Sequence, residues 1–432
     1  MNRLTASRRL AAALLVGCTA LTGAANAQTT PNLRAPHLKP DLTTAEGGIW
    51  DQSDKAESHV RASAELDSDP VLTAYVGGVV CRVAPEYCGD LRTYVLDRPV
   101  FNAAAAPNGY VEVNSGLLLR VRDEDELAFV LGHEVSHFAR NHTFARFQAQ
   151  KNTANAMMVL TAGITIAAAG AAYSTARAGG PYAGQNINTI SSTARSLNDL
   201  VYLSSIASLF SFSREEETEA DQLGFQRAQH AGYRPGASVD LWNGELDEAR
   251  ASDFPKVRTS EVRASIFDTH PVTSDRIAAL TAMGAGVVPA AASPATTADA
   301  ARRYRAVVRP HLGDWLKDDL RRRDYGQTLF LIDRLAGEGE DLGLLSFYRG
   351  ETYRHRRAPG DDALALASYR AATVQPDAPA AAWRELGQAC HKAGDQACAK
   401  DAFSRYIEHD PKAQDRWLVE ADLKSMQQAG GS

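Results

Sequence analysis

The spacing of apolar residues along the chain predicts a mainly helical protein. Apolar positions recur every three to four residues near 54–66 and 70–83 and through most of the C-terminal third, as on the buried face of a helix. Two short runs differ, because β-branched and aromatic residues fill 94–100 and 110–113, with Asn108-Gly109 as a turn signal between them. The pattern predicts a mainly α fold with a small β-sheet, in which a hairpin precedes a long helix.

A long uncharged stretch, residues 152–176, follows that helix, and its centre is strongly apolar. Glycine and alanine dominate it, so it is borderline for a membrane span, which needs ~20 residues. A second apolar run follows at 200–212. Two interpretations stay open: residues 155–212 make a peripheral membrane contact, or they form a lid over a neighbouring cleft, which the moderate hydrophobicity favours.

The N-terminus has the pattern of an export signal. Three arginines precede an apolar run, and Ala25-Asn26-Ala27 forms a small-residue cleavage site. We therefore predict a signal peptide at 1–27 and a periplasmic protein. Lipid attachment at Cys18 is the alternative processing, and the arginine pair Arg8-Arg9 leaves the type of signal open.

Composition and charge limit the partners. The 432 residues, 44% of them apolar and 23% charged, suffice for two or three globular domains. Removing the three arginines of the signal changes the formal charge from −6 to −9, which argues against a nucleic-acid partner. Residues 28–50 contain prolines and little periodicity, which predicts a flexible leader.

Four cysteines beyond the signal form two close pairs, Cys81 with Cys88 and Cys390 with Cys398. Their spacing is not that of a metal site. Export would bring them into an oxidising compartment, so both pairs are disulfide candidates, with buried free thiols as the alternative. Cys390 and Cys398 fall on successive predicted helices, where side chains approach to bridging distance.

The most specific chemical pattern is Gly-His-Glu-Val-Ser-His at residues 132–137, on the helix that opens with four acidic residues. At 3.6 residues per turn, His133 and His137 project from one face and can reach one zinc ion at ~2.0–2.1 Å. Glu134 is rotated off that stripe, where its carboxylate can take a proton from a zinc-bound water. A helix that carries two histidines by chance is the alternative. The motif predicts a zincin-type metallopeptidase domain with one Zn²⁺ per chain.

A second acidic segment, residues 213–221, opens with the spacing of a capping box, so a helix should begin there. Glu217 and Asp221 are four residues apart on one face, as a third zinc ligand and a carboxylate that orients a ligand histidine would be. Two histidines and a glutamate leave a fourth position for water, as in catalytic sites. His142 is the alternative third ligand, but the extended histidine motif needs glycine at 140 and histidine at 143, which this chain lacks.

Together these motifs resemble the membrane-associated gluzincins of the HtpX and CaaX prenyl protease type. The matching residues are Leu131 to His137, Glu217 to Asp221, and Thr269-His270-Pro271 followed by Arg276-Ile277. The chain lacks the several clear membrane spans of those enzymes, and it more closely resembles the periplasmic branch, the β-barrel assembly-enhancing proteases. The resemblance implies that His133, His137 and Glu217 bind zinc. It also implies that Glu134 is the general base and that Asp221 orients a ligand imidazole.

The resemblance also implies further site residues. Periplasmic relatives place the histidine that matches His270 near the zinc, where it would either stabilise the oxyanion or occupy the fourth zinc position as a gate, and we favour the gate. Arg276 would lie behind the ligands. In zinc peptidases with this order of elements, the edge strand beside the site pairs with extended substrate. Residues 101–105 are the expected edge here, with Asn102, Ala103 and Ala105 as substrate-binding residues, and a close-packed loop is the alternative.

A linker rich in alanine, proline and threonine at 282–300 precedes a predicted helical domain at 301–427. This domain matches the 34-residue tetratricopeptide pattern at Trp383, Leu386, Gly387, Gly394, Ala399, Phe403 and Pro411. An earlier unit contains Gly350 and Tyr369. Tyr369 lies 34 residues before Phe403, whereas the first helix of this unit is offset by three residues. Stacked helix pairs of this kind form a concave surface that binds protein segments, and a structural helical cap is the alternative.

The sequence thus predicts an exported zinc metalloendopeptidase, with its catalytic domain at 51–281 and tetratricopeptide-like helices behind it. By resemblance, its substrates would be unfolded or misassembled envelope proteins, and its repeats would contact outer-membrane assembly machinery. The alternative is a periplasmic chaperone or assembly scaffold whose proteolysis is latent or secondary.

Overall fold

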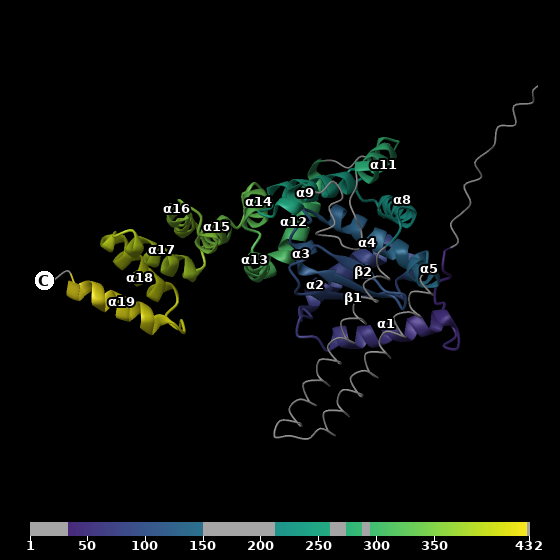
Figure 1. Cartoon of the computed structure of the whole chain (residues 1–432), viewed down its shortest axis with the longest axis horizontal. Coiled ribbons are helices and arrows are strands. Elements are labelled where there is room, and N and C mark those ends of the chain that lie inside the picture. The colour runs from purple at the N-terminus through teal and green to yellow at the C-terminus, as the bar shows by residue number, and fades with distance from the viewer. Residues whose placement is uncertain (1–32, 150–211, 260–273, 287–293, 430–432) are drawn as a thin grey trace, which may run out of the picture. The chain divides into compact units, whose positions relative to one another are not determined.

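A computed structural model describes residues 33–149, 212–259, 274–286 and 294–429. They form a mainly α-helical chain with a small three-stranded sheet, as predicted (Figure 1). The elements up to residue 149 are α1 (Ala45–Arg61), α2 (Pro70–Val83), η1 (Pro85–Tyr87), β1 (Arg92–Leu96), β2 (Ala103–Ala105), β3 (Tyr110–Asn114), α3 (Ser115–Leu118), α4 (Glu124–Ala139) and α5 (His142–Ala149).

The elements from residue 212 onward are all helical in the part of the chain that the structure describes. They are α8 (Arg214–His230), α9 (Ala237–Ala251), α10 (Pro255–Thr259), α11 (Ser274–Ala285), α12 (Pro294–Val308), η2 (Arg309–His311), α13 (Leu312–Arg321), α14 (Tyr325–Ala336), α15 (Leu342–Arg356), α16 (Asp361–Thr373), α17 (Ala380–Lys392), α18 (Gln396–His409) and α19 (Arg416–Ala429).

The sheet has the order β1-β3-β2, with β1 parallel and β2 antiparallel to β3. The predicted hairpin between 94–100 and 110–113 is therefore wrong in its first strand, because the hairpin partner of β3 is β2. The turn at Gly109, whose φ is 89°, connects β2 to β3 as its sequence indicates. Three consecutive alanines form β2, which falls within the edge strand expected at 101–105 although alanine has a low strand propensity. Within the described residues β2 is an edge strand.

The core of the first part lies where α2 and α4 pack on the sheet, since α2 contacts β1 and α4 contacts β2. Helix α4 begins as predicted: the Asp123 side chain caps it by accepting a hydrogen bond from the Glu126 backbone N–H at 2.9 Å. Every residue of α4 is buried, including its acidic first turn. The helix that carries the histidine motif is thus the central helix of this core.

The predicted flexible leader at 28–50 is wrong from residue 33 onward. Helix α1 begins at Ala45, with the Thr44 side chain accepting from the Gly47 backbone N–H. Upstream of it, the buried Arg34 guanidinium donates to the Pro107 carbonyl at 2.6 Å and lies 4.7 Å from the centre of the Phe138 ring. One buried arginine fixes the segment without any periodic pattern, so the sequence does not reveal it. Residues 28–32, the predicted signal peptide and Cys18 lie outside the described residues.

The predicted linker at 282–300 is too long. Helix α11 continues to Ala285 and α12 begins at Pro294; residues 287–293 lie outside the described part. Proline suits the first turn of a helix and alanine is the strongest helix former, so a composition read as linker also fits a helix start. The Tyr304 hydroxyl of α12 is buried and donates to the Leu118 carbonyl. Helix α12 therefore belongs to the peptidase core.

The division between cores lies well beyond residue 301, where the helical domain was predicted to begin. Side chains of α12, α13, α14 and the start of α15 share the core of α2 and α4, as far as Leu345, and a separate core begins at Phe347. A buried ion network reinforces the first core, because Arg120 contacts Glu248 of α9 at 2.7 Å and Asp319 of α13 at 2.6 Å.

Helices α15 to α18 form two pairs, α15 with α16 and α17 with α18. In each pair a glycine of the first helix lies against an aromatic ring of the second. A Cβ added at Gly387 would lie 2.5 Å from the Phe403 ring, and one added at Gly350 would clash in the same way with Tyr369. These contacts support a helical repeat, and they match the repeat positions read from the sequence.

Both cysteine pairs lie at disulfide distance in the structure, Cys81 with Cys88 and Cys390 with Cys398. The second pair joins α17 to α18, as predicted. Among the described residues, none of the helices combines the length and apolar character that crossing a membrane requires. Residues 155–211, which raised the choice between membrane contact and lid, lie outside the described part.

Candidate metal centre

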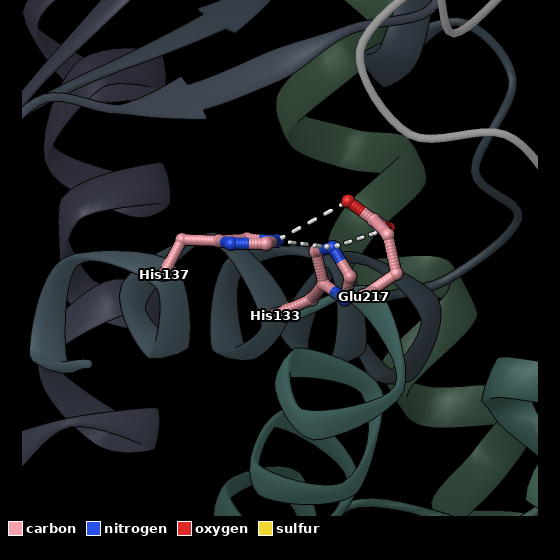
Figure 2. Close-up of side chains that lie close together, drawn as sticks. All are labelled: His133, His137 and Glu217. Atoms are coloured by element: carbon pink, nitrogen blue, oxygen red, sulfur yellow. Dashed lines mark hydrogen bonds and ion pairs between the residues drawn. The ribbon is translucent and has the colours of Figure 1, made fainter. Parts of the chain in front are cut away.

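Two histidines on α4 face one another. His133 and His137 are four residues apart, so they project from the same side of the helix, and both are buried. Their Nε2 atoms lie 3.1 Å apart (Figure 2). This is the arrangement that the sequence motif predicts.

Helix α8 supplies the facing side of the site. It begins as predicted with a capping box, in which the Glu216 backbone N–H donates to Ser213 Oγ at 3.2 Å and the Ser213 N–H donates to the Glu216 carboxylate at 2.7 Å. With its start fixed, Glu217, Asp221 and Gly224 fall on one face at spacings of four and three residues. That face packs on α4.

Glu217 is the glutamate of the acidic run that meets the histidines. Its Oε2 lies 3.6 Å from His133 Nε2 and its Oε1 lies 3.6 Å from His137 Nε2. Glu215 is exposed and Glu216 caps the helix, whereas Glu219 turns to the far side of His137. Figure 2 shows the Glu217 carboxylate directed at the two imidazoles.

Behind His133, a carboxylate and a guanidinium extend the site. Asp221 Oδ1 lies 3.0 Å from His133 Nδ1, and Arg276 of α11 donates to Asp221 twice, at 2.7 and 2.8 Å. Arg276 Nη1 also lies 2.9 Å from Glu217 Oε2. Burial alone would raise the pKa of Asp221, but Arg276 and the hydrogen bond with His133 lower it to about 2. Asp221 is thus a carboxylate that accepts the Nδ1 proton of His133.

Behind His137 lies a second series of hydrogen-bond contacts, which was not predicted from the sequence. His142 Nδ1 lies 2.8 Å from His137 Nδ1, and His142 Nε2 lies 3.0 Å from Glu219 Oε2. Burial lowers the pKa of His142, although Glu219 opposes the shift. The Phe212 ring stacks on His137 with 3.8 Å between centroids. From the sequence, His142 was considered only as a zinc ligand. Its position just beyond the end of α4 was the one signal that it could lie near His137.

The donor set fits a zinc ion. If His133 Nδ1 donates to Asp221, the Nε2 of His133 carries a lone pair, and that lone pair is directed at a second imidazole Nε2 and a carboxylate. Such a cluster of acceptors is stabilised by a cation between them. Four tetrahedral ligands at 2.0–2.1 Å from zinc are separated from one another by about 3.3 Å, close to the 3.1 and 3.6 Å found here. The three side chains therefore form a candidate site for one Zn²⁺.

The remaining predicted site residues are the proposed base, the residues of the edge strand and His270. Glu134 is buried on α4, one residue beyond His133. Ala103 and Ala105 are buried in β2, and the Asn102 carbonyl, next to it, accepts from the Asn114 backbone N–H at 3.0 Å. His270 lies outside the described residues.

Comparisons with known proteins agree with this geometry. Residues 70–284 match the sequence model of peptidase family M48, whose metallopeptidases are zinc-dependent. The β-barrel assembly-enhancing proteases of Escherichia coli (strain K12) and Yersinia pestis are 27% and 29% identical over 274 and 278 residues, which cover 62% and 61% of this chain and 50% and 51% of those proteins. The mitochondrial metalloendopeptidase OMA1 of Schizosaccharomyces pombe is 26% identical over 215 residues, 49% of this chain and 53% of that protein.

The chain spans about half the length of the curated relatives it matches. The family match and the relatives together support a zinc metalloprotease.

Proposed function

The chain carries a peptidase domain of family M48, and from this premise we propose that it is an exported zinc-dependent metalloendopeptidase that cleaves misfolded or stalled cell-envelope proteins. The observation that carries the proposal is the convergence of His133, His137 and Glu217, three buried donors from two helices, within 4.8 Å of one another. Three protein ligands leave a fourth coordination position for water, as catalytic zinc sites do.

A zinc ion held there would supply a Lewis acid that activates water and polarises a peptide carbonyl. Glu134 is the group that we assign to proton transfer. It follows His133 on α4 and is turned about 100° from it around the helix axis, so its carboxylate lies beside the ligand face rather than on it. In this role Glu134 takes a proton from the attacking water and passes it to the leaving amine.

The edge of the sheet supports a binding mode for an extended substrate. Asn102 and Ala106 each make a backbone hydrogen bond with β3, through the Asn102 carbonyl and the Ala106 N–H. Backbone groups alternate in direction along an antiparallel strand, so those of Ala103 and Ala105 point away from β3, toward the edge. We infer that a substrate strand pairs with these two residues. Their small side chains are buried, so the recognition is through the backbone and is tolerant of sequence.

The predicted export signal and the two cysteine pairs at disulfide distance support the periplasm as the compartment. The helices beyond Phe347 form the tetratricopeptide-like part, which we propose contacts clients or outer-membrane assembly machinery. His270 remains the proposed gate or oxyanion donor. A rise in cleavage by His270→Ala with zinc retained would support the gate, and a fall would support the oxyanion role.

Metal removal tests the activity directly. The purified chain is incubated with a labelled, permanently unfolded polypeptide and with the same polypeptide in its folded form, before and after chelation of zinc. We expect cleavage of the unfolded form, its loss on chelation and its recovery when one equivalent of zinc is returned. Cleavage that survives complete removal of metal would refute a zinc peptidase.

A second function, a chaperone or assembly scaffold, is favoured by one observation. A groove of about 980 Å³ opens between α15, α16 and α17, lined by Leu366, Tyr369 and Ala389 together with charged side chains. It has the size and mixed character of a site for a protein segment. In cells that lack the protein, Glu134→Gln separates the two functions: full restoration of envelope integrity supports the scaffold, and failure supports the peptidase.

A further inference from the structure

The two ligand histidines are held from behind in different ways. His133 has a carboxylate, Asp221, at its Nδ1. His137 has a third histidine, His142, whose Nδ1 lies 2.8 Å from the Nδ1 of His137. Both rings of this second pair are buried, with centroids 4.9 Å apart and planes inclined by 70°.

Two nitrogens at 2.8 Å must share one proton, and the surroundings decide which ring donates. His137 Nε2 faces the Nε2 of His133 and the Glu217 carboxylate, on the metal side of the ring. If His137 Nε2 binds zinc, its proton lies on Nδ1 and is donated to His142 Nδ1. The neutral His142 ring then carries its own proton on Nε2, 3.0 Å from Glu219 Oε2. Every donor in the chain of contacts thus has an acceptor.

The fold holds His142 in this position. Asn141, between α4 and α5, adopts a left-handed conformation with φ 56°, which turns the chain so that residue 142 returns toward His137. Glu219 is held in its turn by Arg140, whose Nε lies 2.8 Å from Glu219 Oε1. On the other side, Phe212 stacks on the His137 ring. The ring is therefore fixed at its edge and on one face.

We propose that His142 and Glu219 are a positioning pair for His137, which holds the tautomer and orientation in which His137 Nε2 can bind zinc. This inference rests on the proposed zinc site. Hydrogen-bond partners behind a metal ligand fix its tautomer and raise its basicity, and their loss costs about 10–100-fold in metal affinity. His142 would act through His137, without contact with metal or substrate.

The test is the zinc affinity of four proteins, measured by competition with a chromophoric chelator: wild type, His142→Leu, His142→Asn and Glu219→Leu. Leucine fills the site but accepts no proton, whereas the asparagine Oδ1 stands near the place of the histidine Nδ1. We expect His142→Leu to bind zinc about 10–100-fold more weakly, His142→Asn to recover most of that loss, and Glu219→Leu to fall between. Melting of the metal-free proteins shows whether each variant folds.

Two results would overturn the positioning pair. Equal zinc affinity in wild type and His142→Leu would show that the hydrogen bond is not needed, and equal losses in His142→Leu and His142→Asn would show that only packing matters. Both leave the zinc site itself standing. A wild-type chain that binds no zinc would instead refute the proposed function, and this inference with it. If His142→Leu does not fold, the zinc affinities of the other two variants decide. Weaker binding by Glu219→Leu than by His142→Asn supports the positioning pair, and wild-type affinity in both contradicts it.

Discussion

Gly224 of α8 lies directly against the backbone of His133 on α4. A Cβ built at Gly224 would be 2.7 Å from the His133 backbone N and 2.8 Å from its Cα. One built at Gly132 would be 2.9 Å from the Gly224 carbonyl oxygen. Two glycines thus let the helices cross closely enough for Asp221 and Glu217, one and two turns before Gly224, to reach the histidines.

Gly224→Ala should therefore separate α4 from α8. The added methyl meets backbone rather than a flexible side chain, so we expect a loss of about 1–3 kcal/mol in the free energy of unfolding and a weaker zinc site. Urea unfolding and zinc content measure the two effects. Gly48→Ala is the matched control, because its Cβ would meet nothing within 4 Å in α1 and alanine favours a helix. Equal stability and zinc content in Gly224→Ala and wild type would contradict the close crossing.

Glu217 should be the third protein ligand. Purified Glu217→Ala should lose its zinc, because two imidazoles alone would hold it, while Glu215→Ala and Glu216→Ala should keep one zinc per chain, since neither side chain reaches the site. Glu219→Ala should keep the stoichiometry at saturating zinc with a lower affinity. Metal analysis of the purified proteins decides, and full zinc occupancy in Glu217→Ala would show that the assignment is wrong.

The parts of the site that lie on regular helices could be predicted. Spacings of four residues on a helix place His133 beside His137 and Glu217 beside Asp221, and the capping box fixes where α8 begins. The family resemblance was also correct, since residues 70–284 match peptidase family M48.

The missed parts depend on tertiary contacts. His142 reaches His137 across a turn in which Asn141 takes a left-handed conformation, and periodicity does not predict this turn. An edge strand was expected at 101–105, but its antiparallel pairing with β3 was not. Tyr304 joins the peptidase core from α12, a helix whose first turns have the composition of a linker. Arg34 is anchored by a distant carbonyl, 73 residues along the chain.

Cys390 and Cys398 should form a disulfide in the exported protein. They join α17 to α18, in a repeat near the end of the chain, and oxidising compartments favour such links. Mass spectrometry of non-reduced peptides from protein expressed with its own leader should find the cross-linked pair, and a second one between Cys81 and Cys88. Two free thiols at Cys390 and Cys398 would contradict the prediction.

Asp319 should make the stability of the peptidase core depend on acid pH. Burial alone would raise the pKa of Asp319, but Arg120 and Arg322 lower it from 3.8 to about 2. Because the folded pKa lies below the unfolded one, the stabilisation is complete above pH 3.8 and is lost as the pH falls toward 2. It amounts to about 2 kcal/mol.

Between pH 4 and 2, the free energy of unfolding of Asp319→Asn should accordingly fall by about 2 kcal/mol less than that of wild type. At pH 7 it should cost about 3–5 kcal/mol, since it leaves a buried arginine with one partner fewer. Urea unfolding across this pH range measures both effects. Asp314→Asn, at an exposed position of the same helix, should change neither by more than about 1 kcal/mol. An unchanged pH profile in Asp319→Asn would contradict the ion network.

The most direct measurement compares wild type with Glu134→Gln in one preparation, recording zinc content and cleavage of an unfolded polypeptide together. Glutamine keeps the shape of the side chain but cannot accept the proton. We expect one zinc per chain in both proteins and a rate about 10²–10⁴-fold lower in the variant. Cleavage at the wild-type rate by zinc-loaded Glu134→Gln would contradict the assignment of Glu134 as general base and, with it, the proposed peptidase site.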